Sequence, residues 1–207
     1  NPTTEVVRRI ESGMLKLRLN QYGLKNSDSG ISGGQVRLAV HNPAPITTMQ
    51  AAVTVLSAEA LACPTNAGIT VRSRAQIAGS FFNDGSSTGA GDRTGDIIAG
   101  IQKAADATLG NIIVAFSNRC ANSSCSSNPT LSFQNFIMLG AHKPHTLTVT
   151  WDAANNQFIY SAKPVRGSVE TISLPYTQID SGPPIVDFKQ LQLNNSAANC
   201  NGSRKHA

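Results

Sequence analysis

Charged and aromatic side chains are scarce in this chain. Charged residues make up 14% of it and aromatic residues 5%, whereas a typical soluble domain has about 25% charged residues. No apolar run approaches the roughly 18 residues that a membrane-spanning helix needs, which excludes a helical membrane span. Ser, Thr, Asn and Gly are plentiful instead, as in many secreted β proteins. Apolar residues still make up 40%, which is enough for a core and too much for a disordered chain.

Basic residues outnumber acidic ones, yet they form no nucleic-acid-binding motif. The chain has 17 Lys and Arg against 12 Asp and Glu, a net charge of +5 and a pI near 9.2. These cations are spread along the sequence with few aromatic residues between them, unlike the clustered basic patches of nucleic-acid-binding domains. We therefore expect no nucleic-acid partner and interpret the excess charge as a mildly basic surface.

The four cysteines lack the close pairing that a zinc site needs. Cys120 and Cys125 flank a polar, turn-like tetrapeptide, so we expect a local disulfide between them. Cys63 and Cys200 then pair by elimination, since four cysteines permit three connectivities. Disulfides predict an oxidising location, which is the extracellular space, the cell surface or the periplasm. Because the chain starts at Asn1 rather than Met, we also expect that a leader or a larger upstream portion has been removed.

The stretch from Thr70 to Gln102 predicts two strands joined by a loop. Val71, Ser73, Ala75 and Ile77 alternate with Arg72, Arg74 and Gln76, which is the period of a half-buried strand. Residues 83–94 are rich in Gly, Ser and Asp and form the loop, and an apolar run resumes at Asp96. This pair of strands is the centre of the expected fold.

Short alternating segments recur along the rest of the chain, with hardly any helix. Further strands are expected at residues 6–10, 14–21, 35–40, 46–56, 112–117, 131–139, 145–151, 157–162 and 185–193. A short helical turn is expected over residues 57–62, ended by Pro64. The predicted fold class is all-β, an antiparallel two-sheet β-sandwich with at most one or two short helical turns. We expect a single domain, 1–207, with a polar and partly flexible C-terminal tail at 194–207.

Several segments share a pattern with a known superfamily. They are Gly13–Leu17, Arg74–Asp84, Gly95–Ile101, Thr146–Asp152 followed by Asn155–Tyr160, and Ile185–Phe188. Their order resembles the concanavalin A-like lectin/glucanase superfamily, the jelly-roll sandwich shared by laminin G-like domains, pentraxins and legume lectins. The resemblance spans most of residues 13–193 and is one of pattern. Families of this fold include lectins, adhesive modules and glycan-cleaving enzymes, so the fold alone leaves function open.

Basic residues on the outward faces of the predicted strands are candidate ligand-binding residues. They are Lys16, Arg18, Arg37, Arg72 and Arg74. If these strands are neighbours, the side chains form a cationic face suited to carboxylate or sulfate groups. The alternative is a solvated face whose cations pair with scattered acids.

Oxygen-bearing side chains in and beside the loop after Asn83 are candidate calcium ligands. They are Asn83, Asp84, Asp92 and Asp96, and hard oxygen ligands suit Ca²⁺. The spacing matches no EF-hand, and the alternative is turn chemistry and solvation. The resemblance adds to the calcium hypothesis, because laminin G-like domains and pentraxins often use calcium near such loops.

Catalytic motifs are not evident in the sequence. Paired glutamates of the kind glycosidases need are not indicated by Glu5, Glu11, Glu59 and Glu170, and no nucleophile elbow occurs. Trp151 is either a core residue or a sugar-stacking platform, and its phase with Leu147 and Val149 favours the core. The sequence therefore predicts a secreted or surface-exposed, non-catalytic lectin-like module that recognises a glycan or an extracellular protein. The alternatives are a glycoside hydrolase or polysaccharide lyase on the same fold, and a purely structural module of a larger extracellular protein.

Overall fold

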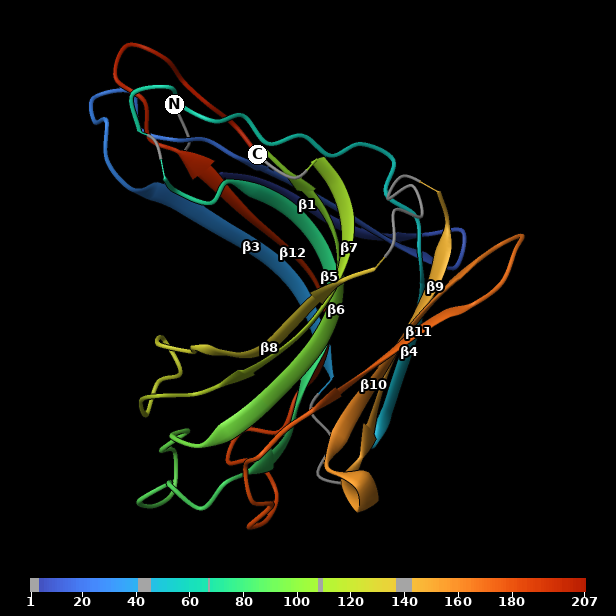
Figure 1. Cartoon of the computed structure of the whole chain (residues 1–207). Coiled ribbons are helices and arrows are strands. Elements are labelled where there is room, and N and C mark those ends of the chain that lie inside the picture. Colours follow the sequence, from blue (N-terminus) through green and yellow to red (C-terminus); the bar gives the residue numbers. More distant parts are fainter. Residues whose placement is uncertain (1–3, 41–45, 67, 108–109, 137–142) are drawn as a thin grey trace.

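The computed structural model describes residues 4–40, 46–66, 68–107, 110–136 and 143–207, and within these ranges the protein is almost entirely strand (Figure 1). The elements are β1 Thr4–Glu11, β2 Met14–Gln21, β3 Ile31–Val40, β4 Thr48–Val53, β5 Arg72–Asn83, β6 Asp96–Asp106, β7 Gly110–Arg119, β8 Thr130–Asn135, β9 His145–Asp152, the short 3-10 helix η1 Ala153–Asn155, β10 Gln157–Pro164, β11 Glu170–Pro175 and β12 Lys189–Ala198. No helix in the described ranges is long and apolar enough to cross a membrane.

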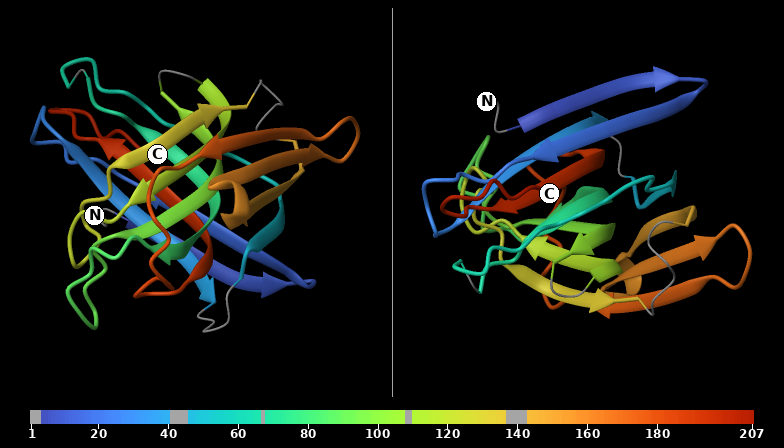
Figure 2. Two further views of the ribbon diagram at one scale, coloured as in Figure 1. Left: turned by 60° about the horizontal axis from the view of Figure 1, so that its bottom comes forward. Right: turned by 90° about the horizontal axis from the view of Figure 1, so that it is seen from above.

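The strands form an antiparallel sandwich whose second layer is in two parts. One layer is a six-stranded sheet in the order β3-β12-β5-β6-β7-β8. The second layer contains a four-stranded sheet, β11-β10-β9-β4, and the separate hairpin β1-β2. The hairpin contacts β12 and β3, whereas the four-stranded sheet contacts β5 and β6. Seen from above, both parts lie on the same side of the six-stranded sheet (Figure 2).

The core lies between the six-stranded and four-stranded sheets. Leu147 and Val149 of β9, Phe158 and Tyr160 of β10 and Ile77 of β5 belong to one apolar cluster, and each is almost completely buried. The alternating period of these strands places every second side chain on this inner face, so a strand contributes apolar residues at i and i+2. The predicted all-β sandwich is confirmed.

A β-bulge in β5 adds two consecutive aromatic residues to this core. The register with β6 shifts between Ser80 and Phe82, so Phe81 and Phe82 are both buried. Phe82 stacks on Trp151 at a centroid distance of 5.4 Å, and the indole Nε1 of Trp151 donates a hydrogen bond to the hydroxyl of Tyr176 at 2.9 Å. Trp151 is therefore half-buried at one end of the core, as its phase predicts.

Several strand or helix assignments differ from the sequence prediction, and residues 137–139 of the predicted strand 131–139 lie outside the described residues. Strand β3 begins at Ile31 rather than at residue 35. Residues 57–62 form no helical turn, because this segment runs beside the C-terminal residues and Leu61 N–H donates to the carbonyl of His206. Strand β11 lies in a stretch that the sequence presents as a loose, proline-containing connection, and β12 begins at Lys189 rather than at Ile185. Tertiary pairing decides each of these cases, and local propensity does not report it.

The C-terminal segment is more ordered than a polar tail would be. Residues up to Ala198 continue β12 between β3 and β5, and Ala207 exchanges two backbone hydrogen bonds with Gln21. The disulfide between Cys63 and Cys200 ties the segment to the loop after β4, and Cys120 pairs with Cys125. Both predicted disulfides are confirmed, and their formation agrees with an oxidising location.

Candidate functional site

The outer face of the six-stranded sheet is concave (Figure 1), and most of the side chains that line it are polar. The alternation of side chains along β12 explains why this face is polar. Leu191 and Leu193 face the second layer, whereas Gln190, Gln192 and Asn194 face outward. The outward side chains surround a hollow of about 350 Å³. This hollow is the candidate ligand site.

Register divides the concave face into two halves along the strands. One, called here the guanidinium–amide half, consists of Gln35, Arg37, Arg72, Arg74, Gln76, Gln102, Gln192 and Asn194. The other, called the aromatic half, consists of Ala78, Arg93, Ile98, Phe116, Asn118, Phe133, Phe188 and Gln190, with Cys125, Asn128 and Thr130 at its rim.

A row of glutamines crosses the guanidinium–amide half. Gln76 Nε2 donates to Gln192 Oε1 at 2.9 Å, and Gln192 Nε2 donates to Gln35 Oε1 at 2.7 Å. Gln190 Nε2 also donates to Gln192 Oε1, at 2.6 Å. Side chains from three adjacent strands are thus joined by amide hydrogen bonds, which fixes the orientation of several donors and acceptors on the face.

Three of the five predicted basic residues meet on this face. Arg72 forms an ion pair with Asp106, and its guanidinium lies 5.9 Å from the ring centroid of Phe133. Arg74 donates to the carbonyl oxygen and to Oδ1 of Asn194, at 3.0 and 2.9 Å. Burial, together with the neighbouring charge of Arg72, lowers the pKa of Arg74 to about 10. Arg37 is exposed to solvent.

The other two predicted basic residues, Lys16 and Arg18, lie elsewhere. Both belong to β2 in the hairpin, and Lys16 forms an ion pair with Glu11. The hairpin covers the opposite face of the six-stranded sheet, where Asn195 Nδ2 donates to the carbonyl of Leu19 at 2.9 Å. These two side chains therefore do not line the hollow.

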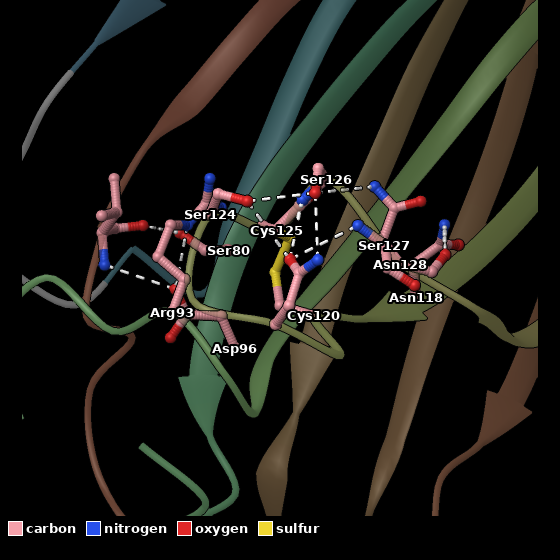
Figure 3. The surroundings of a disulfide bond; sticks show 12 residues. Ser80, Arg93, Asp96, Asn118, Cys120, Ser124, Cys125, Ser126, Ser127 and Asn128 are labelled. Carbon is pink, nitrogen blue, oxygen red and sulfur yellow. Dashed lines mark hydrogen bonds and ion pairs between the residues drawn. A yellow bond between two sulfur atoms is a disulfide. The ribbon is translucent and has the colours of Figure 1, made fainter. Parts of the chain in front are cut away.

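The loop closed by the Cys120–Cys125 disulfide borders the aromatic half (Figure 3). Gly95 N–H donates to the carbonyl of Cys120, and Cys120 N–H donates to the carbonyl of Asp96, both at 2.9 Å. Within the loop, Asn122 Oδ1 accepts a hydrogen bond from Ser126 N–H at 3.0 Å. The disulfide and these bonds hold the rim of the hollow in place.

Two of the proposed calcium ligands, Asn83 and Asp96, are used in internal hydrogen bonds. Asn83 Nδ2 donates to Asp96 Oδ1 at 2.9 Å, so the amide nitrogen faces the carboxylate. The same Oδ1 accepts from Ile185 N–H at 2.8 Å, and Arg93 pairs with Oδ2 at 3.4 Å. This buried carboxylate anchors the segment before β12 to the end of the β5–β6 hairpin.

The other two proposed calcium ligands, Asp84 and Asp92, are also satisfied by protein donors. Burial acts to raise the pKa of Asp84, but hydrogen bonds from Arg119 and Ser86 outweigh it and lower that pKa. Asp92 accepts hydrogen bonds from the hydroxyls and N–H groups of Thr88 and Thr94, which lower its pKa strongly.

Ca²⁺ does not fit these four residues as the structure arranges them. The ion needs six to eight oxygen ligands directed at one point, whereas these carboxylates face protein donors. Among the described residues, one group of three ligand-type side chains converges, Asp28 with Cys63 and Cys200. Its two sulfurs form a disulfide, so it offers no thiolate to a metal.

Acid–base groups do not converge on the hollow. In the part of the chain that the structure describes, its lining contains no His, Tyr, Lys, Asp or Glu. Asp106 and Asp96 lie beside it and pair with Arg72 and Arg93. What the face offers is hydrogen bonding, positive charge and aromatic surface.

Sequence reasoning missed the glutamines and the aromatic half. The alternation of Gln190, Gln192 and Asn194 with two leucines is visible in the sequence and marks an outward amide row. Phe116 and Phe133 carry no comparable pattern, because an apolar residue in a strand is normally assigned to the core. Only the pairing of β7 with β8 places both rings on the outer face.

No family model and no curated protein sequence matches the chain. Among solved structures, the lectin UEA-II complexed with galactose aligns with 98% of this chain and 87% of its own, at 11% identity and a TM-score of 0.40. Peanut lectin with a nine-residue peptide covers 100% and 88%, at 12% identity and a TM-score of 0.40. The CBM2 module of the evolved Dit of Lactobacillus casei BL23 phage J-1 covers 99% and 93%, at 10% identity and a TM-score of 0.36. All three TM-scores are below 0.5, so these likenesses identify neither a function nor a binding residue of this chain.

Proposed function

We propose that this chain is a non-catalytic, lectin-like module, secreted or surface-exposed, that binds an acidic polysaccharide on the concave face of its six-stranded sheet. The observation that supports this most is the composition of the hollow. Arginines and carboxamides line it, and among the described residues no side chain there suits acid–base catalysis.

The chemistry of the guanidinium–amide half favours a ligand with both hydroxyl and carboxylate groups. Carboxamides donate and accept at once, as sugar hydroxyls do. Guanidiniums bind carboxylate or sulfate in a forked geometry. Asp106 offsets the charge of Arg72, whereas Arg74 is held by the neutral Asn194. Together with the exposed Arg37, this leaves the half cationic.

Catalysis on a glycan has less support. A glycosidase needs two carboxyl groups about 5 to 10 Å apart on either side of the scissile bond, and the described lining of the hollow supplies none. Calcium is not part of the proposal either, since the loop carboxylates already have protein donors. The proposed module therefore binds without turnover and without a metal.

The test compares two charge reversals on opposite faces. Arg37→Glu places a negative charge on the concave face, and Arg18→Glu makes the same change on the hairpin. Binding of fluorescent polyuronate and sulfated polysaccharides is measured at low salt, because surface electrostatics are screened as salt rises. We expect Arg37→Glu to weaken binding by at least about tenfold, or about 1.4 kcal/mol, and Arg18→Glu to change it less than twofold.

Two results would overturn the proposal. One is that the wild-type protein retains no acidic polysaccharide at low salt. The other is that Arg18→Glu weakens binding as much as Arg37→Glu, which would mean that net charge rather than the concave face is recognised. Release of reducing sugar or of unsaturated product from any retained polysaccharide would instead establish an enzyme.

A further inference from the structure

The aromatic half of the concave face has an apolar floor. Phe116 lies directly over Gly100, since a Cβ added to Gly100 would stand only 2.5 Å from Cζ of Phe116. Ala78 and Gly100 are paired neighbours on β5 and β6, so small residues support the ring from below. Phe133, on β8, pairs with Phe116 of β7, and its side chain is 45% exposed. An exposed ring on a polar sheet face presents surface that the apolar face of a sugar can cover.

Unpartnered polar atoms surround this floor. Gln190 Oε1, Asn118 Oδ1 and Arg93 Nη2 are buried and have no hydrogen-bond partner within the described ranges. Gln190 as a whole is only 9% exposed. All three side chains line the hollow, and they account for three of the five such atoms found in the described residues.

Such atoms reduce the stability of the fold unless they gain a hydrogen-bond partner. A buried donor or acceptor without a partner has lost its hydration and gained no hydrogen bond in return. The amide nitrogens of Asn118 and Gln190 donate to Asn128 and Gln192. The terminal torsions of Asn and Gln are soft, so we expect the two oxygens to adjust to a ligand in the hollow. Two acceptors and one donor beside an aromatic floor suit hydroxyl or amide groups on the ring edge of a sugar.

The two halves differ in net charge and meet where the guanidinium of Arg72 lies 5.9 Å from the ring centroid of Phe133. In the aromatic half, the guanidinium of Arg93 is paired with Asp96 and lies 5.5 Å from the ring centroid of Phe188. Its positive charge is thus offset within the protein. The guanidinium–amide half holds the exposed Arg37 and also Arg74, which donates to the neutral Asn194 and shares the nearby carboxylate of Asp106 with Arg72.

We propose that the aromatic half binds an uncharged sugar unit while the guanidinium–amide half binds an acidic one. The preferred ligand is then a heteropolysaccharide in which acidic and neutral units are neighbours, rather than a homopolymer of acidic sugars. This inference rests on the proposed function and specifies the ligand class of the same site.

The experiment compares two polymers and three variants. The polymers are oligomers of hyaluronan, in which glucuronate alternates with an uncharged N-acetylated sugar, and oligogalacturonate of matched length. Affinities are measured at low and at high salt for the wild type, Phe133→Ala, Asn118→Ala and, as the control in the other half, Arg37→Ala. Phe133 is exposed and Asn118 lies at the hollow, so both variants are expected to fold, which circular dichroism verifies.

We expect hyaluronan oligomers to bind at least about tenfold more tightly than oligogalacturonate, a difference of about 1.4 kcal/mol. Phe133→Ala and Asn118→Ala should each weaken hyaluronan binding several-fold at both salt concentrations and weaken oligogalacturonate binding clearly less, because that polymer has no uncharged unit for the aromatic half. Arg37→Ala should weaken binding of both polymers and reduce the dependence on salt. If both polymers bind equally and neither aromatic-half variant has an effect, this inference is wrong and the proposed function stands. If neither polymer binds at low salt, both are overturned.

Discussion

Lys103 is a charged residue on the inner face of the sandwich, and its burial predicts a particular dependence of stability on pH. The residue is 1% exposed. Its ammonium donates to the backbone carbonyls of Val53, at 2.9 Å, and of Lys143. His145 lies in the same cluster and donates its Nδ1 hydrogen to the carbonyl of Lys143 at 2.7 Å. Neutral carbonyls replace only part of the hydration of an ammonium, so burial lowers the pKa of Lys103 to about 8.

The number of protons bound in the folded and unfolded states decides whether stability rises or falls with pH. Between about pH 8 and pH 10.5 the unfolded chain holds a proton on this lysine that the folded chain has lost, so the free energy of unfolding rises with pH. The full difference of about 2.5 pKa units corresponds to about 3 kcal/mol, of which about 2 kcal/mol falls between pH 7.5 and 9.5. Burial raises the pKa of Tyr160, which opposes this trend above about pH 10, so measurements should stop near pH 9.5.

The assay is urea unfolding at several pH values with the disulfides intact, followed by circular dichroism. Lys103→Met keeps the length of the side chain and removes the titrating group, so the rise of about 2 kcal/mol should disappear. Lys163→Met, at an exposed position of β10, should retain it. A wild-type curve that is flat from pH 7.5 to 9.5, or a Lys103→Met protein that keeps the slope, would refute the assignment of a destabilised ammonium to this site.

Three further predictions concern the loops and the sheet. Removing divalent ions with EDTA should shift the Tm by less than about 1 °C, because the loop carboxylates are held by protein donors; a larger drop, reversed by Ca²⁺, would establish a calcium site. Gly100→Ala should lower the free energy of unfolding by about 2 kcal/mol, since its Cβ would meet Phe116 at 2.5 Å and the carbonyl of Ile77 at 2.8 Å; denaturant unfolding checks this, and an unchanged midpoint would contradict the close packing. Replacing Cys63 and Cys200 with Ala should cost about 5 kcal/mol and replacing Cys120 and Cys125 about 2 kcal/mol by loop-closure entropy; the reverse order in denaturant unfolding would contradict it.

Strand alternation made most of the sandwich predictable from the sequence. In β5, Ile77 lies in the core and Arg72, Arg74 and Gln76 point outward, as the period of two requires. The hairpin turn at Ser12 and Gly13 also follows from local sequence, since both residues have a positive φ. Where a local pattern determines the structure, the prediction and the structure agree.

Pairing between strands that are far apart in the sequence decides which residues share the concave face, and the sequence alone does not predict it. Arg37 and Arg74 are 37 positions apart and share a face because β12, from the other end of the chain, lies between their strands. Lys16 has the same alternating pattern as Arg37, yet its hairpin covers the opposite face. An alternating pattern identifies which residues point the same way within one strand. It does not identify which strands are neighbours or which face is left uncovered.

The outer face of the six-stranded sheet differs from an ordinary solvated sheet surface in its energetics. Exposed polar side chains satisfy one another or water at little cost, whereas a polar network that is buried and only partly satisfied is destabilising. The glutamines on β5, β12 and β3 satisfy one another, but Gln190, Asn118 and Arg93 each keep a buried polar atom without a partner within the described residues. The unpartnered atoms lie in the aromatic half, beside the exposed ring of Phe133. A ligand that covers the ring and supplies partners for these buried atoms would gain binding free energy from the new hydrogen bonds. Its binding should therefore raise the Tm of the wild type more than that of Asn118→Ala.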